Sequence, residues 1–316
     1  MSKWINKDLF NQFANQKKQE KDAPSGGGMM RSDMVWRTPE KGTADRAKVY
    51  EGRFLVDPKG VFYKKFYYHM FQVGDKWQFF LCPKTFGFDE YCDLCTVTSK
   101  LYMGDSSDKK SAYQFKRKEK FVGNFYIVSD PRDAENDEKV GGTVKLYEFP
   151  GKVEVKLKEQ ITDTQNGLGP AIFDPGPDGF NFILKVGATK KDRNGNIWPD
   201  YGLSDFSRRS GALGTEKEIN DIMASTYDID EYIQSRERPE EDIMSVLKQL
   251  MFEDLVKSDR KMAASLKSDA VDDDIPDFDK KGKVEILENQ GSDEVPFDTG
   301  DEVIDTDELL KQLDDI

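Results

Sequence analysis

The sequence is poor in histidine, in cysteine and in long apolar runs. Among its 316 residues there are one His and three Cys. No stretch approaches the roughly 20 consecutive apolar residues that a membrane helix needs, and the first thirty residues lack the apolar segment of a secretory signal. We therefore expect a soluble protein that is not exported.

Hydrophobic residues are also scarce, at 37%, while charged residues reach 34%. The formal net charge of −13 taken alone argues against a polyanionic partner. However, residues 269–316 hold 18 Asp and Glu against four Lys, a net charge of −14, so residues 1–268 carry +1. The acidic segment is nearly free of aromatic residues, which predicts a disordered tail attached to a neutral body. The total charge therefore does not exclude nucleic acid.

Both ends of the chain contain short amphipathic patterns. Near the C-terminus, Leu309, Leu310 and Leu313 lie at helical spacing beside carboxylates, as in a segment that folds on a partner protein; a solvated tail is the alternative. Residues 1–22 predict an amphipathic arm that docks on the body or on another protomer, with a frayed terminus as the alternative. The cations predicted to serve this arm are Lys3, Lys7, Lys17 and Lys18. A Gly-rich linker, 23–34, follows.

The middle of the chain has the pattern of a β protein. Short runs rich in Val, Ile, Phe and Tyr, bounded by Gly, Pro and Asp, predict strands at 52–56, 61–71, 77–82, 121–128, 143–149, 152–157 and 180–186. Gly74-Asp75 and Asn194-Gly195 indicate hairpin turns. After residue 210, Thr215 with Glu218 forms a possible capping box, and Pro239 suits the first turn of another helix. We expect a β-rich sandwich or barrel whose C-terminal part is helical, within a core of residues 35–268.

The single histidine and all three cysteines lie within 27 residues: His69, Cys82, Cys92 and Cys95. The spacing is His-x12-Cys-x9-Cys-x2-Cys, and four nitrogen and sulfur ligands fit tetrahedral Zn²⁺. A disulfide would leave one cysteine unpaired, and unrelated free thiols are the other alternative. Four protein ligands leave no open position for a catalytic water, so we expect one structural zinc. No general base or nucleophile motif remains, and we expect no enzymatic activity.

Aromatic residues are concentrated next to a basic cluster. Between Val61 and Tyr126 there are 18 Phe, Tyr and Trp in 66 residues, against 12% for the chain. Cations that can follow phosphates, interleaved with rings that can stack on unpaired bases, are typical of single-stranded nucleic-acid binding. A solvated basic loop over an aromatic core is the alternative. The cations are Lys109, Lys110, Lys116, Arg117, Lys118 and Lys120, and the interleaved rings are Tyr113, Phe115 and Phe121.

These residues resemble the single-stranded DNA-binding, helix-destabilising proteins of T-even-type bacteriophages. The metal-ligand spacing matches that family's zinc pattern at every interval, and the 116–118 cluster, the 181–186 segment and the acidic tail ending in leucines are similar too. The arm departs from the family, because Lys3 and Lys7 are separated where the family has a compact basic motif.

The resemblance implies an OB-fold core with a zinc subdomain beside a basic cleft. It implies a basic arm for cooperative self-association along DNA, and an acidic tail for viral partners such as polymerase, helicase loader, primase and recombination mediator. It places the protein in the cytoplasm of an infected bacterial host. The residues that fall near the family's cleft aromatics are Tyr102, Tyr113, Phe121, Tyr147 and Phe182.

The sequence thus predicts a protein that coats single-stranded DNA without sequence specificity during viral replication, recombination and repair. The alternative is a zinc-stabilised scaffold for protein interactions, in which every aromatic belongs to the core and the tail recruits partners. A titration with single-stranded oligonucleotide would separate the two, because the scaffold would show no quenching of tryptophan fluorescence.

Overall fold

The computed structural model describes residues 4, 8, 10, 11, 13, 15, 33–37, 39–43, 45–88, 90–134, 139–191, 195 and 197–269. Among these residues no helix is both long enough and apolar enough to span a bilayer. Most of the predicted arm and the whole predicted acidic segment beyond Asp269 lie outside the described residues. They include Lys3, Lys7, Lys17, Lys18, Leu309, Leu310 and Leu313.

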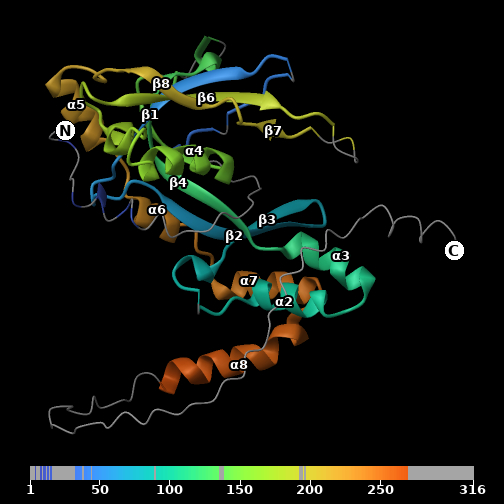
Figure 1. Ribbon diagram of the computed structural model, residues 1–316. Coiled ribbons are helices and arrows are strands. Elements are labelled where there is room, and N and C mark those ends of the chain that lie inside the picture. The colour runs from blue at the N-terminus through green and yellow to red at the C-terminus, as the bar shows by residue number, and fades with distance from the viewer. Residues whose placement is uncertain are drawn as a thin grey trace, which may run out of the picture. The chain divides into compact units, whose positions relative to one another are not determined.

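One antiparallel sheet organises the described part of the chain (Figure 1). Its strand order is β3-β2-β4-β1-β6-β7, with β5 also paired to β4 and β8 to β6, and every pairing is antiparallel. The strands are β1 Lys48–Leu55, β2 Lys64–Val73, β3 Lys76–Leu81, β4 Lys118–Ser129, β5 Val144–Phe149, β6 Phe180–Ala188, β7 Pro199–Asp200 and β8 Asp205–Ser210. A β-rich core with several helices is confirmed.

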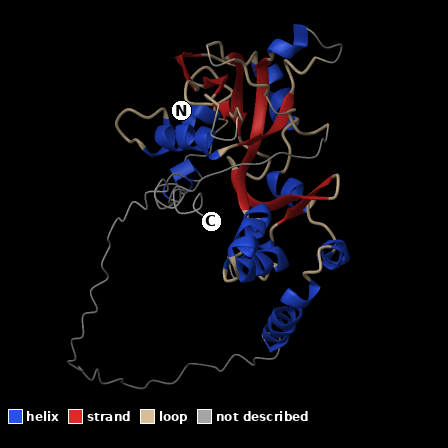
Figure 2. Ribbon diagram, turned by 90° about the vertical axis from the view of Figure 1, so that its right-hand side faces the viewer, coloured by secondary structure: helices blue, strands red, loops and turns tan. Residues whose placement is uncertain are grey.

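The helices gather around different parts of this sheet, and the long strands connect the groups (Figure 2). The α-helices are α2 Asp93–Tyr102, α3 Ser106–Phe115, α4 Gly151–Thr162, α5 Glu216–Ala224, α6 Ile229–Gln234, α7 Glu240–Gln249 and α8 Glu253–Asp269. Short 3₁₀ turns are η1 Pro83–Thr85, η2 Pro131–Ala134 and η3 Gly169–Phe173. The helical C-terminal part of the body is confirmed by α5 to α8.

Two hydrophobic clusters divide the body into lobes. In the sheet lobe, the inner faces of β1, β4, β5 and β6 pack with α4 and η3 around rings such as Phe54, Phe125 and Phe182. In the metal lobe, the β2–β3 hairpin packs with α2, α3, α7 and α8 around Phe71, Phe115 and the cysteines. A third cluster joins α6 to β2 and β4. Strand β4 takes part in the sheet of both lobes, because it pairs with β1, β2 and β5.

The prediction of a strand at 152–157 was wrong, because these residues belong to the first half of α4. Val153, Val155 and Leu157 alternate with charges, as in a strand, but Val153, Leu157 and Ile161 also recur every four residues. It is this second set that is buried in the sheet-lobe core. Pro150 at the N-cap, with an extended backbone, ends the preceding segment and lets the helix begin at Gly151.

Several turns and caps follow the sequence prediction. Gly74 adopts a φ of 58° in the β2–β3 turn, a conformation that glycine reaches without steric cost. Thr215 and Glu218 form the predicted capping box of α5: the Thr215 hydroxyl accepts from the Glu218 amide, and the Glu218 carboxylate accepts from the Thr215 amide. Pro239 is the N-cap of α7 and lies one residue before the helix.

Part of the predicted arm docks on the sheet lobe of its own chain. Phe10 is buried, its ring edge meets Phe62 at a centroid distance of 5.6 Å, and Phe13 stacks on Phe62 at 5.0 Å. The Phe10 ring also contacts Phe173, and the Phe13 ring contacts Tyr63. These two rings thus lie against the body, which is one of the two docking partners predicted for the arm.

Candidate metal centre and nucleic-acid interface

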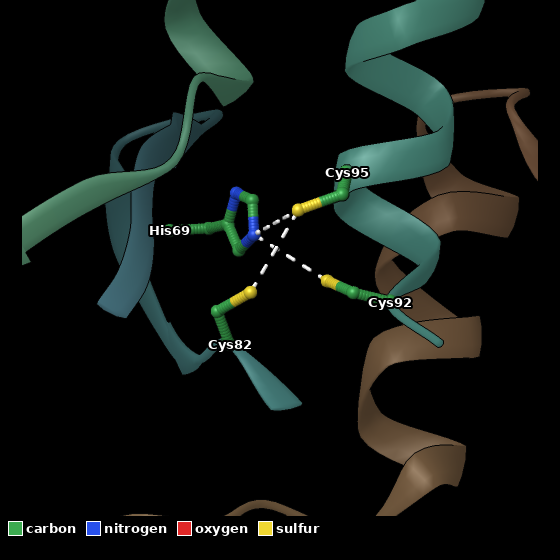
Figure 3. Close-up of side chains that lie close together, drawn as sticks. All are labelled: His69, Cys82, Cys92 and Cys95. Atoms are coloured by element: carbon green, nitrogen blue, oxygen red, sulfur yellow. Dashed lines mark hydrogen bonds between the residues drawn. The ribbon is translucent and has the colours of Figure 1, made fainter. Parts of the chain in front are cut away.

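The four predicted metal ligands come together in the metal lobe (Figure 3). His69 lies on β2, and Cys82 directly follows β3, where its amide donates to the Tyr67 carbonyl at 2.8 Å. This pairing brings Cys82 beside His69. Cys92 is the N-cap of α2 and Cys95 lies in its first turn, so that both sulfur atoms point toward the hairpin. All four ligand atoms lie within 4.8 Å of one another.

The distances between these atoms fit a tetrahedral metal ion. The His69 Nε2 atom is 3.4 Å from Cys92 Sγ and 3.5 Å from Cys95 Sγ, and the Cys82 and Cys95 sulfurs are 3.7 Å apart. Typical zinc bonds of about 2.3 Å to sulfur and about 2.0–2.1 Å to nitrogen give tetrahedral edges of about 3.8 Å and about 3.6 Å. A disulfide requires about 2.05 Å between sulfurs, so the three cysteines are free thiols. A metal ion is what this donor set can hold.

The imidazole of His69 is oriented for this role by the main chain. The His69 Nδ1 atom lies 2.7 Å from the Phe115 carbonyl oxygen, which only accepts, so Nδ1 carries the proton and Nε2 presents its lone pair to the thiols. Thr98 on α2 donates to the same carbonyl at 3.1 Å. The end of α3 therefore fixes the tautomer and the direction of the ligand nitrogen.

Without a metal ion, the side chains of the cluster shift one another's pKa. Burial lowers the pKa of His69, but hydrogen bonds with the Cys82 and Cys95 sulfurs and their charges raise it to about 9. Hydrogen bonds from Cys82 and Cys92 lower the pKa of Cys95, whereas the Cys82 and Cys95 sulfurs raise the pKa of Cys92. Thiolates at such separations repel one another, and a positive charge between them would offset that repulsion. A divalent ion would supply that charge.

A surface of cations and exposed rings lies on the same lobe. The Arg117 guanidinium lies over the rings of Tyr67 at 4.6 Å and of Phe88 at 5.6 Å, and these two rings are 5.8 Å apart. Lys116 lies over the Tyr113 ring at 5.9 Å. Phe88 is 64% exposed and Tyr113 is 69% exposed. We call Lys65, Tyr67, Phe88, Lys109, Tyr113, Lys116 and Arg117 the cation–aromatic surface.

The comparisons with known proteins decide which family shares this arrangement. The model of the family described as "gp32 DNA binding protein like" matches residues 53–251, which include the four metal ligands and the whole cation–aromatic surface. The chain belongs to this family. The predicted resemblance to the T-even bacteriophage proteins is thereby confirmed.

Two relatives of this gp32-like chain are the single-stranded DNA-binding proteins of Enterobacteria phages T4 and T2. Each is 31% identical over 153 residues, which cover 48% of this chain. The matched part spans about half of the relatives' own length, 46% in both. The family is one of DNA-binding proteins, in agreement with the prediction that the chain is not an enzyme.

The structure brings several of the predicted DNA contacts of the gp32-like chain to the surface. Tyr102, at the end of α2, is 44% exposed, and Lys109 and Lys116 are exposed. Arg117 is half-buried, with its guanidinium against the rings of Tyr67 and Phe88. Lys110 lies within α3, and its side chain is outside the described residues.

Two predicted lysines are engaged within the protein. Lys118 is half-buried and donates to the Met70 carbonyl at 3.2 Å, and burial lowers the pKa of its amine. Lys120 is buried, with its amine 3.5 Å from the Glu148 carboxylate. Burial lowers the pKa of Lys120 even though Glu148 raises it. Neither amine is placed to follow a phosphate in this conformation, because β4 turns both toward other strands.

Three predicted rings lie in the sheet-lobe core instead of on the surface. Phe121 is 4% exposed, Tyr147 is 1% exposed and Phe182 is fully buried. Phe182 packs against Phe54 and Phe206, and Phe121 stacks on Phe149. A base cannot stack on a ring that is enclosed in this way. In this conformation these three side chains are therefore part of the core.

The sequence analysis did not select Lys65, Tyr67 or Phe88. The prediction relied on the density of aromatic residues between Val61 and Tyr126, and this density does not distinguish exposed rings from buried ones. Strand periodicity could have found Tyr67, because it shares one face of β2 with the ligand His69. Phe88 lies in the irregular segment between Cys82 and Cys92, where no periodicity predicts exposure.

Proposed function

We propose that this gp32-like chain binds single-stranded DNA without sequence specificity and thereby protects it and keeps it free of secondary structure. The observation that carries the proposal is the cation–aromatic surface, whose exposed rings alternate with cations inside the family-matched segment. Stacking on an aromatic face contributes about 1–3 kcal/mol per base and does not read sequence. By mass action, bound strands cannot pair again.

A titration with a fluorescent single-stranded oligonucleotide at several salt concentrations tests the proposal. The cations of the surface are Lys65, Lys109, Lys116 and Arg117, and four phosphate contacts predict that log affinity falls with log salt at a slope of about −3. Lys116→Ala should weaken binding and reduce the slope by about 0.7. Lys217→Ala, an exposed lysine on α5, should leave both unchanged. A salt-independent affinity, or no binding, would favour the protein-interaction scaffold.

We further propose that the metal centre holds one structural Zn²⁺. His69, Cys82, Cys92 and Cys95 would be its ligands, and the ion would join the β2–β3 hairpin to α2 beneath the cation–aromatic surface. When bound, the ion supplies a cross-link between elements whose own core is small. Metal analysis of the purified full chain should give one zinc per molecule, and the absence of zinc would contradict this.

The remaining roles rest on the family resemblance. We propose an OB-fold as the finer description of the sheet lobe. We propose DNA replication, recombination and repair in the cytoplasm of an infected bacterium as the setting. Residues 1–22 would form the cooperativity arm, 23–34 a linker, 35–268 the DNA-binding core, and 269–316 a disordered tail that recruits replication and recombination proteins. Sedimentation of the full chain with long single-stranded DNA, with and without residues 1–22, tests the arm's role in self-association.

A further inference from the structure

Helix α8 packs against α2, the helix that carries the ligands Cys92 and Cys95. Val256 is fully buried in the same cluster as Cys82 and Cys92. The Phe252 ring, just before α8, meets the edge of Phe115 at 5.5 Å. The family-matched segment ends at residue 251, before α8 begins, so the family model does not account for this helix.

Polar contacts fix the position of α8 on α2. On the α2 side, the Lys100 amine donates to the Leu255 carbonyl at 2.5 Å and pairs with Asp259 at 3.0 Å. The Tyr91 hydroxyl, next to the ligand Cys92, lies 3.5 Å from the Val256 carbonyl. The contacts to Leu255 and Val256 reach main-chain atoms of α8, so they hold the helix itself and not only its side chains.

The strongest link joins Arg260 of α8 to Asp93. The Arg260 guanidinium donates two hydrogen bonds to the two Asp93 oxygens, at 2.6 and 2.5 Å, in the bidentate geometry that is both strong and directional. The Asp93 side chain is 8% exposed and the Arg260 side chain is 21% exposed. Arg260 also pairs with Glu240 of α7. One guanidinium therefore ties together three helices of the metal lobe.

The position of Asp93 in the chain connects this ion pair to the metal ligands. Asp93 lies between the ligands Cys92 and Cys95 and is the first residue of α2. A carboxylate fixed at this point restricts the backbone that sets the separation of the two sulfur atoms. Groups that orient metal ligands in this way typically change metal affinity by about 10- to 100-fold when they are removed.

We propose that α8 is a clasp on the metal centre, in which Arg260 acts as a positioning residue that holds the Cys92–Cys95 segment through Asp93. The proposal rests on the zinc site proposed above. Because coupling between two equilibria is reciprocal, the metal must stabilise the docking of α8 by as much as docked α8 stabilises the bound metal.

The first test measures the rate at which zinc passes from the full-length protein to a chromophoric chelator. Arg260→Ala should bind one zinc, as the unmodified chain does, but release it about 10- to 100-fold faster. Arg260→Lys keeps one charged donor and should be intermediate. Lys257→Ala is the matched control, because Lys257 pairs with Glu253 and Asp254 of its own helix. Equal release rates for Arg260→Ala and the unmodified chain would overturn the clasp alone.

The second test needs no substitution, and so does not depend on the folding of a variant. Hydrogen exchange of the α8 amides in the unmodified protein should accelerate when zinc is removed, whereas α5 amides should be unaffected. Unchanged protection of α8 after metal removal would contradict the clasp. If the unmodified protein proves to bind no zinc at all, the proposed metal centre fails as well, so the two failures can be told apart.

Discussion

The two lobes of the body contain similar residues but use them differently. In the sheet lobe the rings face inward and contact one another, as Phe54 does with Phe125, Phe149 and Phe182. In the metal lobe several rings face outward, and Phe88, Tyr102 and Tyr113 are all exposed. Rings form a core in both lobes, since Phe71 and Phe115 are buried in the metal lobe, but the metal lobe also leaves rings outside, where they are available for binding.

We expect the largest effect from removing the metal ion, which should unfold the metal lobe and leave the sheet lobe folded. Structural zinc contributes apparent binding free energies of about 10–16 kcal/mol in small zinc domains, more than the stability of most domains. Cys82→Ser, or exhaustive chelation, should abolish hydrogen-exchange protection in α2 and α3 while β1 and β6 remain protected. Unmodified protein carried through the same steps and reloaded with zinc is the control. Equal loss in both lobes would mean that they do not differ in what stabilises them.

The next effect tests whether a sheet-lobe ring serves stability or DNA binding. Phe182→Ala removes a fully buried ring, and we expect the free energy of unfolding to fall by about 3–5 kcal/mol. Urea denaturation measures this change. Affinity for single-stranded DNA should be retained under conditions in which the variant is folded. Weaker DNA binding without a loss of stability would indicate that Phe182 contacts DNA, as the family resemblance implies.

The converse effect is expected for an exposed ring of the metal lobe. Tyr113→Ala should weaken binding to single-stranded DNA by about 1–3 kcal/mol, because one stacking face is removed. Its unfolding free energy should change little, since 69% of Tyr113 is exposed. Tyr113→Phe keeps the ring and should bind like the unmodified chain. Fluorescence titration and urea denaturation of the same preparations give both quantities, and a stability loss without an affinity loss would reverse the assignment.

The smallest effect provides a baseline outside both lobes. Thr215→Ala removes the N-cap of α5 and should lower the free energy of unfolding by about 1 kcal/mol. Zinc release and DNA affinity should not change, because the hydrogen bonds of this cap join Thr215 to Glu218 within α5. Lys217→Ala on the same helix leaves the cap intact and should have no effect on stability. A change in zinc release would show that the lobes are coupled more widely than their contacts indicate.

The metal centre could be predicted from the sequence because its chemistry depends on residue type and spacing. A single His and three Cys within 27 residues leave few other interpretations. The capping box of Thr215 and the turn at Gly74 were predictable for the same reason, since each depends on neighbours in sequence.

The division of rings and lysines between core and surface could not be predicted in this way. Lys120 is removed from the surface by Glu148, which lies on another strand. Tyr147 is buried by rings from three other segments, Trp36, Phe54 and Phe125. In α4, one apolar pattern fits two periods, and only the position of the sheet-lobe core decides between them. Each of these outcomes depends on tertiary contacts that local spacing does not contain.

The hydrogen bond between His69 and the Phe115 carbonyl has a practical consequence. Phe115 lies between Tyr113 and Lys116, so the same short stretch of main chain presents side chains to the outside and orients a metal ligand within. A spectroscopically active ion such as Co²⁺, placed in the centre, should therefore change its visible absorption when this stretch shifts. The metal site would then act as an optical probe of strand binding that requires no label on the DNA.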